Sequence, residues 1–475
     1  MKTFLISLLA AASLNAAVGP DYTRPTTPVA ATWRDNAAST VWKAGAPADA
    51  YARDEWWKLF ADPVLDNLET RALTANEDLK AAAARVEEAR ASAGLARSAY
   101  WPQVGVNPSV TRDHASLSAP NALPDPLTTT YRAPLAASWE LDLFGRVRRL
   151  YEGARAEAEA SAATFEAVRL ALTAEVATTY FSLQALDTES VLITDGVALR
   201  AHALELVTSR RTSGAATDFD VARAETELAS TQAEAAAIAR NRAQLQYALA
   251  VLVGAPAPAF ELSTLNSQPS TIPAVPAGIP SDLLERRPDV AAAERILAAA
   301  NARIGVAKAA FFPAISLTGS AGFASGDIDQ LFKTDSRTWS IGPSLYLPIF
   351  QGGRNRANLV RSRAAYDESV ATFRQSVLVA FREVQDALTG TRLLAEQSAA
   401  QERALEAARR VGALAQKRYD AGFVNYFEVI DAQRTVLSTE RASARLAAQR
   451  LNNSVTLIKA LGGGWTAAPA VLVSR

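Results

Sequence analysis

The sequence contains two copies of one pattern, and this internal repeat constrains the fold more than any other feature. Residues 78–104 align with residues 289–315 at an offset of 211, and residues 210–221 align with residues 418–429 at an offset of 208. The order is preserved and the offsets drift by only a few residues, as one duplicated unit with small loop changes would give. We therefore expect two related halves, although a length of 475 residues alone suggests about three domains.

Composition excludes several classes of function. The 49 Lys and Arg residues balance 49 Asp and Glu residues, whereas a nucleic-acid-binding protein usually carries a basic excess. The chain has no cysteine, which excludes disulfides, thiolate metal sites and thiol nucleophiles. Its two histidines, His114 and His202, lie far apart in sequence and argue against a metal cluster. We find no nucleophile–base constellation, and expect no enzyme activity, no cofactor and no metal.

Residues 1–17 (MKTFLISLLAAASLNAA) have the pattern of an export signal peptide. Lys2 gives a positive start, a short apolar core follows, and small residues come after it. The apolar run is too short to span about 30 Å of hydrocarbon as a helix, and no later segment has 18 consecutive apolar residues. The exported protein is therefore expected to be either soluble or embedded in a membrane as a β-barrel.

Proline content and the repeat divide the rest of the chain. Residues 18–62 form an irregular N-terminal segment rich in Pro, Thr and Trp. Residues 254–280 hold six of the 22 prolines and predict an extended connector, because proline continues neither a helix nor a central strand. The first copy of the repeat is then 63–253, the second is 281–464, and 465–475 is a C-terminal tail.

Each copy is predicted to contain, in this order, a helix, two strands, a long helix and a last helix. In the first copy Pro63 opens a helix that runs to about Ser98. A proline-free stretch, about 146–210, predicts one long helix, and a last helix covers 217–253. Apolar residues recur by sevens along the long helix, which predicts left-handed supercoiling against its neighbours. Placed end to end, the two short helices would match the long one in length.

Alternating apolar and polar residues predict four short strands, at about 103–114, 131–143, 314–323 and 337–348. Four strands cannot close a barrel alone. Three chains with four strands each would close a twelve-stranded barrel with its apolar face on lipid. The alternative, an ordinary two-sided sheet packed on a core, stays open. The predicted apolar face consists of Val104, Val106, Leu135, Trp139, Ile315, Leu317, Trp339 and Ile341.

Short motifs along nearly the whole chain resemble those of TolC-type outer-membrane efflux factors. The resemblance is to the NodT/OprM-like branch, which serves resistance-nodulation-division pumps. Any one of these motifs is weak, but their order and spacing together are highly specific. They are GPDYxRP at 19–25, WWxxFxDPxL at 56–65, ERRPDV at 285–290, AFFP at 310–313, PIFxGGR at 348–354, DAQR at 431–434 and KALGGGW at 459–465.

The resemblance implies a mainly α-helical, TolC-like homotrimer. A twelve-stranded β-barrel, four strands per chain, would cross the outer membrane of a Gram-negative bacterium, and a long coiled-coil helical barrel would project into the periplasm. Residues 18–62 would lie in a periplasmic, equatorial segment. The chain would be the passive duct of a tripartite efflux system, with a periplasmic adaptor (membrane fusion) protein and an inner-membrane resistance-nodulation-division pump as partners.

The resemblance fails at one position. The branch commonly starts its mature chain with a lipidated cysteine just before the GPDY segment. Ala16 or Ala17 stands there in this sequence. The lipid anchor is therefore absent from this sequence: either the protein relies on its barrel alone, or the sequence was altered from one that has the cysteine.

Two turns between helices, 210–221 and 418–429, are the candidate functional positions. Gly214 and Gly422 would permit tight helix exits, and the resemblance assigns Gly214, Gly422 and Phe423 to adaptor contact. Gate aspartates of the family match Glu428 and Asp431 here. Each acid could equally complement the positive end of its own helix, and this alternative stays open. The full set of gate candidates is Asp431, Glu428, Asp220, Asp218 and Val424, the last as a hydrophobic constriction.

Two classes of function remain after this reading. The first is an outer-membrane efflux channel, which carries small molecules from the adaptor and pump to the exterior. The second is an exported soluble coiled-coil scaffold or interaction protein. The alternating strand faces and their aromatic residues favour the channel, whereas release from membranes by salt or carbonate would favour the scaffold.

Overall fold

The computed structural model describes residues 17–26, 55–116, 118, 126–262, 272–273 and 287–463. The expected signal peptide (except Ala17), part of the N-terminal segment, most of the connector and the C-terminal tail lie outside these residues. The chain divides into two compact units. One comprises Met1–Thr26, Arg85–Ala162 and Ala292–Arg374, and the other Thr27–Ala84, Ala163–Ala291 and Gln375–Arg475. Each unit therefore draws on both copies of the repeat.

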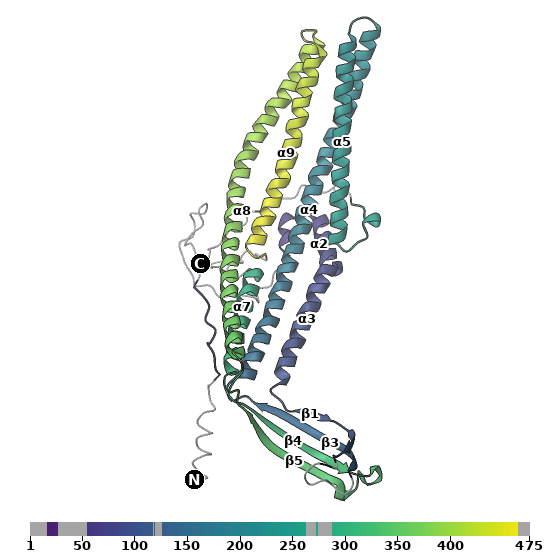
Figure 1. Cartoon of the computed structure of the whole chain (residues 1–475). Coiled ribbons are helices and arrows are strands. Elements are labelled where there is room, and N and C mark those ends of the chain that lie inside the picture. Colours follow the sequence, from purple (N-terminus) through teal and green to yellow (C-terminus); the bar gives the residue numbers. More distant parts are fainter. Residues whose placement is uncertain are drawn as a thin grey trace, which may run out of the picture. The chain divides into compact units, whose positions relative to one another are not determined.

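Two long helical hairpins repeat the same lengths (Figure 1). The first is α4 (Arg146–Thr212) followed by α5 (Asp218–Leu252), and the second is α8 (Arg354–Asp420) followed by α9 (Tyr426–Ala460). The long helices have 67 residues each and the short ones 35 each, and α8 begins 208 residues after α4. The predicted long and short helices are thus confirmed. No helix in the described ranges has both the length and the apolar character to cross a membrane.

The single helix predicted from Pro63 to Ser98 is wrong at one position. The structure has α2 (Pro63–Ala75) and α3 (Glu77–Ser98), separated by Asn76 with an extended ψ of 127°. The Asn76 side-chain oxygen accepts a hydrogen bond from the backbone N–H of Leu79 at 2.9 Å. Asparagine favours such a cap over a place inside a helix, which explains the break. The counterpart of α3 in the second copy is α7 (Pro288–Ala309), also of 22 residues.

The short helices stack end to end, as predicted. The Asn76 amide donates to the carbonyl oxygen of Leu252 at 3.0 Å, so α3 begins where α5 ends. In the second copy the Arg287 guanidinium donates to the carbonyl oxygen of Ala460 at 3.1 Å, so α7 begins where α9 ends. Short 3₁₀ turns complete the helical inventory of the described residues: Trp56–Phe60, Ala257–Ala259, Ile328–Gln330 and Thr334–Ser336.

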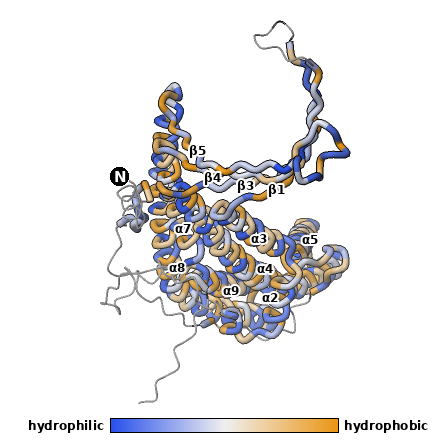
Figure 2. Tube along the Cα trace, turned by 90° about the horizontal axis from the view of Figure 1, so that it is seen from below, coloured by the Kyte–Doolittle hydropathy of each residue, from blue (hydrophilic) through white to orange (hydrophobic). Residues whose placement is uncertain are grey.

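One antiparallel sheet contains all five strands of the described chain. They are β1 (Gln103–Val106), β2 (Ser109–His114), β3 (Leu127–Leu141), β4 (Ala314–Ser325) and β5 (Arg337–Tyr346). The order is β1-β3-β4-β5, with β2 also paired to β3, and the strands lie side by side in Figure 2. The predicted strand 103–114 is interrupted at Asn107-Pro108, because proline cannot donate to a ladder.

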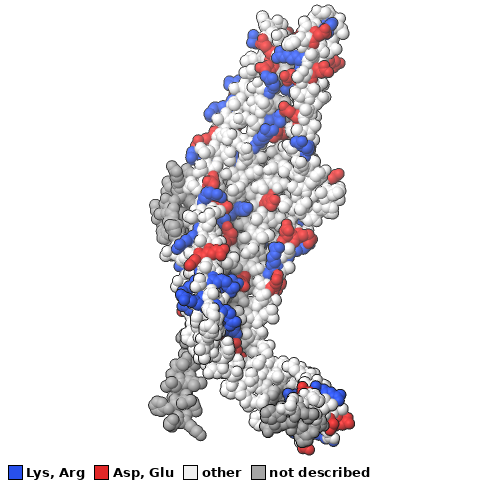
Figure 3. Space-filling model, viewed as in Figure 1, with Lys and Arg blue, Asp and Glu red and all other residues white. Residues whose placement is uncertain are grey.

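The strand register places the predicted apolar residues on one face. Val106 lies opposite Leu135, Leu135 opposite Ala321, and Ala321 opposite Trp339, so one row crosses the whole sheet. Trp339 is 79% exposed, and Val104, Val106, Leu135 and Ile341 are exposed as well. Trp139, Ile315 and Leu317 are half-buried on the same face. In Figure 3 charged side chains gather at the far end of the sheet, and the stretch before it is mostly white.

The WWxxFxDPxL motif builds the core of the second unit. Phe60, Leu65, Tyr180 and Phe181 are fully buried there, and the rings of Phe60 and Phe181 lie 5.0 Å apart. The Tyr180 hydroxyl donates to the carboxylate of Asp62 at 2.8 Å, and the same carboxylate caps α2. The motif therefore starts α2 and fixes it to the long helix α4.

The GPDYxRP motif is an extended strap fixed to the helices of the first unit. Asp21 pairs with buried Arg149 of α4 at 2.6 Å, and Arg24 pairs with buried Glu294 of α7 at 3.2 Å. Gly305 of α7 lets the strap lie close. A Cβ built at Gly305 would lie 2.7 Å from Cγ of Arg149 and 3.0 Å from the carbonyl oxygen of Val18.

Candidate functional site

The two hairpin ends have the same backbone design. Gly214 follows α4 with a φ of 78°, and Gly422 follows α8 with a φ of 77°. The N–H of Ala215 bonds to the carbonyl of Arg210 at 2.8 Å, and the N–H of Phe423 bonds to the carbonyl of Arg418 at 2.9 Å. These are Schellman closures, in which glycine adopts the left-handed conformation that other residues avoid.

The helices that leave the turns have different caps. Thr217 and Asp220 form a capping box at the start of α5: the Asp220 N–H donates to the Thr217 hydroxyl, and the Thr217 N–H donates to the Asp220 carboxylate at 2.9 Å. At the start of α9, the Asn425 side chain accepts from the N–H groups of Phe427 and Glu428 at 3.1 and 3.3 Å. Glu428 is therefore not part of a capping box, whereas Asp220, at the equivalent position of α5, is.

Both candidate acids of the first hairpin have partners in their own turn. The backbone N–H of Thr217 lowers the pKa of Asp220, and a hydrogen bond from Arg211 lowers the pKa of Asp218. The Arg211–Asp218 contacts are 2.7 and 3.2 Å. Asp220 is therefore part of the cap of α5, and Asp218 pairs with the last turn of α4, so both acids have a role in holding their own turn.

The two hairpin ends pack on each other through a small apolar cluster. Val207 of α4 is buried with Tyr426, Val429 and Ile430 of α9. The Tyr426 ring lies 5.0 Å from that of Tyr419, and the Arg210 guanidinium lies 5.3 Å from the Tyr419 ring centre. The cluster ties both turns into one structural element.

A groove of about 700 Å³ opens beside this cluster and brings together two of the five predicted gate residues, Glu428 and Asp431. Arg434 pairs with Asp431 at 2.5 Å, and Arg418 lies 3.8 Å from Glu428. Asp218, Asp220 and Val424 do not line the groove. The other lining residues are Arg223, Val411, Leu414, Ala415, Asn425, Phe427, Ala432 and Thr435.

Sequence reasoning missed the basic residues of this site and the aromatic Phe219 and Phe427, whereas it named Phe423 as an adaptor contact. The Arg223 guanidinium stacks 4.4 Å from the ring centre of Phe427. Phe219, the counterpart of Phe427 in the first copy, is 73% exposed, and Phe423 is 78% exposed. The three-residue spacing of Asp431 and Arg434 could have revealed their pairing, whereas Arg223 and Phe427 come from different copies and share no local pattern.

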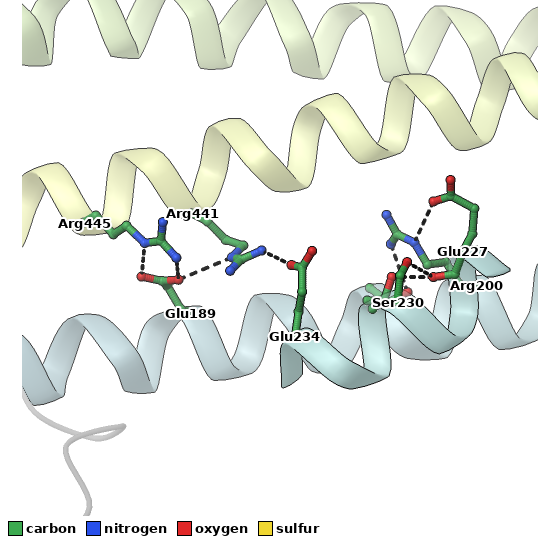
Figure 4. A network of polar contacts seen from close by, with 9 residues as sticks. Glu189, Arg200, Glu227, Ser230, Glu234, Arg441 and Arg445 are labelled. Atoms are coloured by element: carbon green, nitrogen blue, oxygen red, sulfur yellow. Dashed lines mark hydrogen bonds and ion pairs between the residues drawn. The ribbon is translucent and has the colours of Figure 1, made fainter. Parts of the chain in front are cut away.

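A polar seam joins the first hairpin to α9. Figure 4 shows Glu189 of α4 between two arginines of α9: Arg445 contacts it at 2.6 and 2.7 Å and Arg441 at 3.3 Å. Arg441 also binds Glu234 of α5 at 2.5 Å. The Glu189 side chain is only 2% exposed, so its charge depends on these partners.

The described residues bring no three His, Asp or Glu side chains together in the way that a bound metal ion would need. The polar groups of the hairpin ends are instead carboxylates and guanidiniums at the surface. Such a surface can repel, attract or dock charged groups.

Comparisons with known proteins agree with this arrangement. A family model described as outer membrane efflux protein matches the chain twice, at residues 68–255 and 279–463. The toluene efflux pump outer membrane protein TtgF of Pseudomonas putida is 37% identical over 470 residues, 98% of each chain. Outer membrane protein OprJ of Pseudomonas aeruginosa is 37% identical over 476 residues, 99% of this chain and 97% of OprJ.

A solved structure shares the architecture. The open state of the Neisseria gonorrhoeae MtrE outer membrane channel matches with a TM-score of 0.81 at 33% identity, covering 94% of this chain and 98% of MtrE. The fold is thus that of the TolC-like outer-membrane channels, with long helices and a sheet portion. The chain therefore belongs to the outer membrane efflux protein family and is an outer-membrane component of an efflux system.

Proposed function

We propose that three copies of the chain assemble into a passive duct for small molecules. The observation that carries this proposal is the sheet with two open edges and one exposed apolar face. Among the described residues of one chain, β1 and β2 pair only with β3, and β5 pairs only with β4. Three copies would satisfy every edge in one closed twelve-stranded sheet, and the face that contains Val104, Trp339 and Ile341 would meet lipid.

The hairpin ends would then form the periplasmic gate and the contact with an adaptor protein. Asp431 and Glu428 are the strongest gate candidates, because they lie in one groove and neither caps its helix. Three copies of these carboxylates around a narrow axis would repel one another or bind cations. The exposed Phe423, between Gly422 and Val424, offers an apolar contact to the adaptor.

The duct itself would perform no chemical step. An inner-membrane resistance-nodulation-division pump would supply the energy and pass its cargo through the periplasmic adaptor. Asp218 and Asp220 would serve mainly to hold the first turn, in line with their contacts to Arg211 and Thr217.

Planar-bilayer conductance tests the gate. Asp431→Ala should raise the conductance and weaken block by added cations, because the carboxylate ring is removed. Asp386→Ala is the matched control, since it also removes an acid that pairs with a nearby arginine of its own helix, at 3.8 Å. Unchanged conductance and unchanged block in Asp431→Ala would refute the gate role.

Two further measurements test the duct. Light scattering of the detergent-extracted protein should give three times the chain mass. Membrane fractionation should leave the protein in the carbonate-resistant fraction. A monomer, or release by carbonate, would instead support the soluble scaffold.

A further inference from the structure

One seam within the chain joins the two copies of the repeat. In it, α4 of the first copy packs on α7 of the second. Arg303 pairs with Glu157, and a neighbouring pair, Arg295 and Glu159, lies at 3.6 Å. The helices also approach closely, because a Cβ built at Gly153 would lie 3.6 Å from both the Ala299 carbonyl oxygen and the Ala302 Cβ. The seam thus combines ion pairs with a contact between small residues.

The repeat defines a second, equivalent seam. Shifting α4 by 208 residues gives α8, and shifting α7 back by 211 residues gives α3. Yet α8 and α3 lie apart in one chain, in both Figure 1 and Figure 2. Within the single chain, α8 and α3 therefore do not form this second seam.

The open face of α3 has the features of a contact surface without its partner. Gly94 is the counterpart of Gly305, which needs its small size to pack on Arg149 and the strap. Nothing in the described chain lies within 4 Å of a Cβ built at Gly94, and Leu95 beside it is 74% exposed. A mid-helix glycine weakens a helix relative to alanine, so its own chain gives no reason for Gly94.

The residue types at the second seam are exchanged in a complementary way. Where the first seam has Gly153 and Ala299, the second has Arg361 on α8 and Glu88 on α3. The ion pair Glu157 and Arg303 of the first seam corresponds to two small residues of the second, Ala365 on α8 and Ser92 on α3. The counterparts of the pair Glu157 and Arg303 are thus small, whereas the counterparts of Gly153 and Ala299 are oppositely charged. The second ion pair of the first seam, Arg295 and Glu159, has the counterparts Ala84 and Asp367.

Arg361 and Glu88 are both exposed, and neither has an oppositely charged partner among the described residues. The Arg361 guanidinium donates only to the side chain of Asn358, at 2.8 Å. Around it, α8 carries four arginines before its first acid, Asp367, and basic side chains gather near the start of this helix in Figure 3. The four are Arg354, Arg356, Arg361 and Arg363.

We infer that α8 of one copy packs on α3 of the next copy, with Arg361 facing Glu88 of that copy. The inference rests on the proposed trimer and adds the residues that select the contact. The exchanged residue types also favour the pairing of α8 with α3 over a pairing of α8 with α7. If α8 packed on α7, Arg361 would meet Ala299 and lose its partner, which disfavours the wrong pairing.

Cysteine cross-linking tests the contact directly, because the chain has no cysteine of its own. The variant with Glu88→Cys and Arg361→Cys, treated with a short thiol-specific cross-linker in outer membranes, should give a band at three times the chain mass. The matched control joins Glu88→Cys with Arg363→Cys. Arg363 lies two residues on, so its side chain points to the opposite face of α8, and the trimer band should be lost or strongly reduced.

Charge exchange gives a second, independent readout. Arg361→Glu and Glu88→Arg alone should each lower the temperature at which detergent-solubilised trimer dissociates, by roughly 1–2 °C. The double variant should recover at least half of that shift, whereas Arg363→Glu should cause less than a third of it. Helical circular dichroism of each variant reports whether the chain still folds.

The outcomes separate this inference from the proposed function. A trimer that neither cross-links through positions 88 and 361 nor shows recovery in the double variant would overturn the contact and leave the duct intact. A wild-type protein that is monomeric in detergent and in membranes would overturn both.

Discussion

The side-chain amide of Asn76 donates a hydrogen bond to the carbonyl oxygen of Leu252, with 3.0 Å between nitrogen and oxygen. Its side-chain oxygen accepts from the N–H of Leu79 at the same time. One side chain therefore ends α5 and begins α3, although 176 residues separate Asn76 from Leu252. A Cβ built at Gly254 would lie 2.5 Å from the Ala75 carbonyl oxygen, so the two helix ends meet closely.

Asn76→Ala should destabilise the protein by about 1–2 kcal/mol. The variant loses the cap of α3 and leaves the Leu252 carbonyl without its donor. Denaturant unfolding followed by circular dichroism measures the change. Asn241→Ala, at an exposed position inside α5, is the control and should stay within about 0.5 kcal/mol of wild type. Equal effects of the two variants would contradict the bridging role of Asn76.

Arg445→Ala should destabilise the seam between the first hairpin and α9 by about 2 kcal/mol. Glu189 stays buried and keeps only Arg441, so the cost falls below the roughly 3–5 kcal/mol of a fully unpaired buried charge. Removing both charges, as Glu189→Leu with Arg445→Leu, should recover most of the loss.

The control for this seam is an exposed ion pair. Arg409 binds Glu440 at 2.8 Å, and the Glu440 side chain is 20% exposed, whereas that of Glu189 is 2% exposed. Arg409→Ala should therefore cost less than about 1 kcal/mol. A larger loss for Arg409→Ala than for Arg445→Ala would contradict the importance of burial at Glu189.

Glu69 should make the folded protein less stable as the pH rises. Burial raises the pKa of Glu69 well above its ordinary value, and the nearby Asp66 adds to this. Neither carboxyl oxygen has a hydrogen-bond partner in the part of the chain that the structure describes. Between the unfolded and folded pKa values the folded state holds a proton that the unfolded state has lost. This contribution to stability is therefore greatest near pH 4 and declines as the pH rises through the folded pKa.

Two variants separate the pH effect from the packing effect. Glu69→Leu should stabilise the protein at pH 7 by about 1–3 kcal/mol, because a buried unpaired polar group is removed. Glu69→Gln should abolish this pH dependence but keep an unpaired polar group, so it should give a smaller gain. Glu225→Gln, at an exposed position of α5, should change neither property. Unfolding at pH 4 and pH 7 measures all three.

Gly214→Ala and Gly422→Ala should each destabilise their hairpin end by about 1 kcal/mol and by nearly the same amount. Both glycines have a φ near 78°, and no atom of the described residues outside the turn lies within 4 Å of a Cβ built at either. The cost is therefore backbone strain alone. Hydrogen exchange of the turn amides measures it, and asparagine at the same positions should cost less because it tolerates this conformation. A large difference between the two turns would contradict their equivalence.

The sequence predicted the elements that depend on local pattern. Seven-residue spacing and the absence of proline marked α4, and the structure places it at Arg146–Thr212. Residue alternation marked the strands and the apolar face, and the register confirms that Val106, Leu135 and Trp339 lie on one side. Of the gate candidates, Asp431 and Glu428 share one groove, whereas Asp220 caps its own helix.

What the sequence determined by itself is the duplicated helix and strand pattern, because each element follows from residues a few positions apart. Only the tertiary structure decided which distant residues meet. Glu189 pairs with Arg445, which lies 256 residues later in the chain. Asn76 interrupts a predicted helix because its side chain bonds to the backbone of both Leu79 and Leu252. The physical reason is that buried charges and helix ends need hydrogen-bonding or charged partners, and tertiary packing decides which residues lie close enough to supply them. No local sequence pattern identifies those residues.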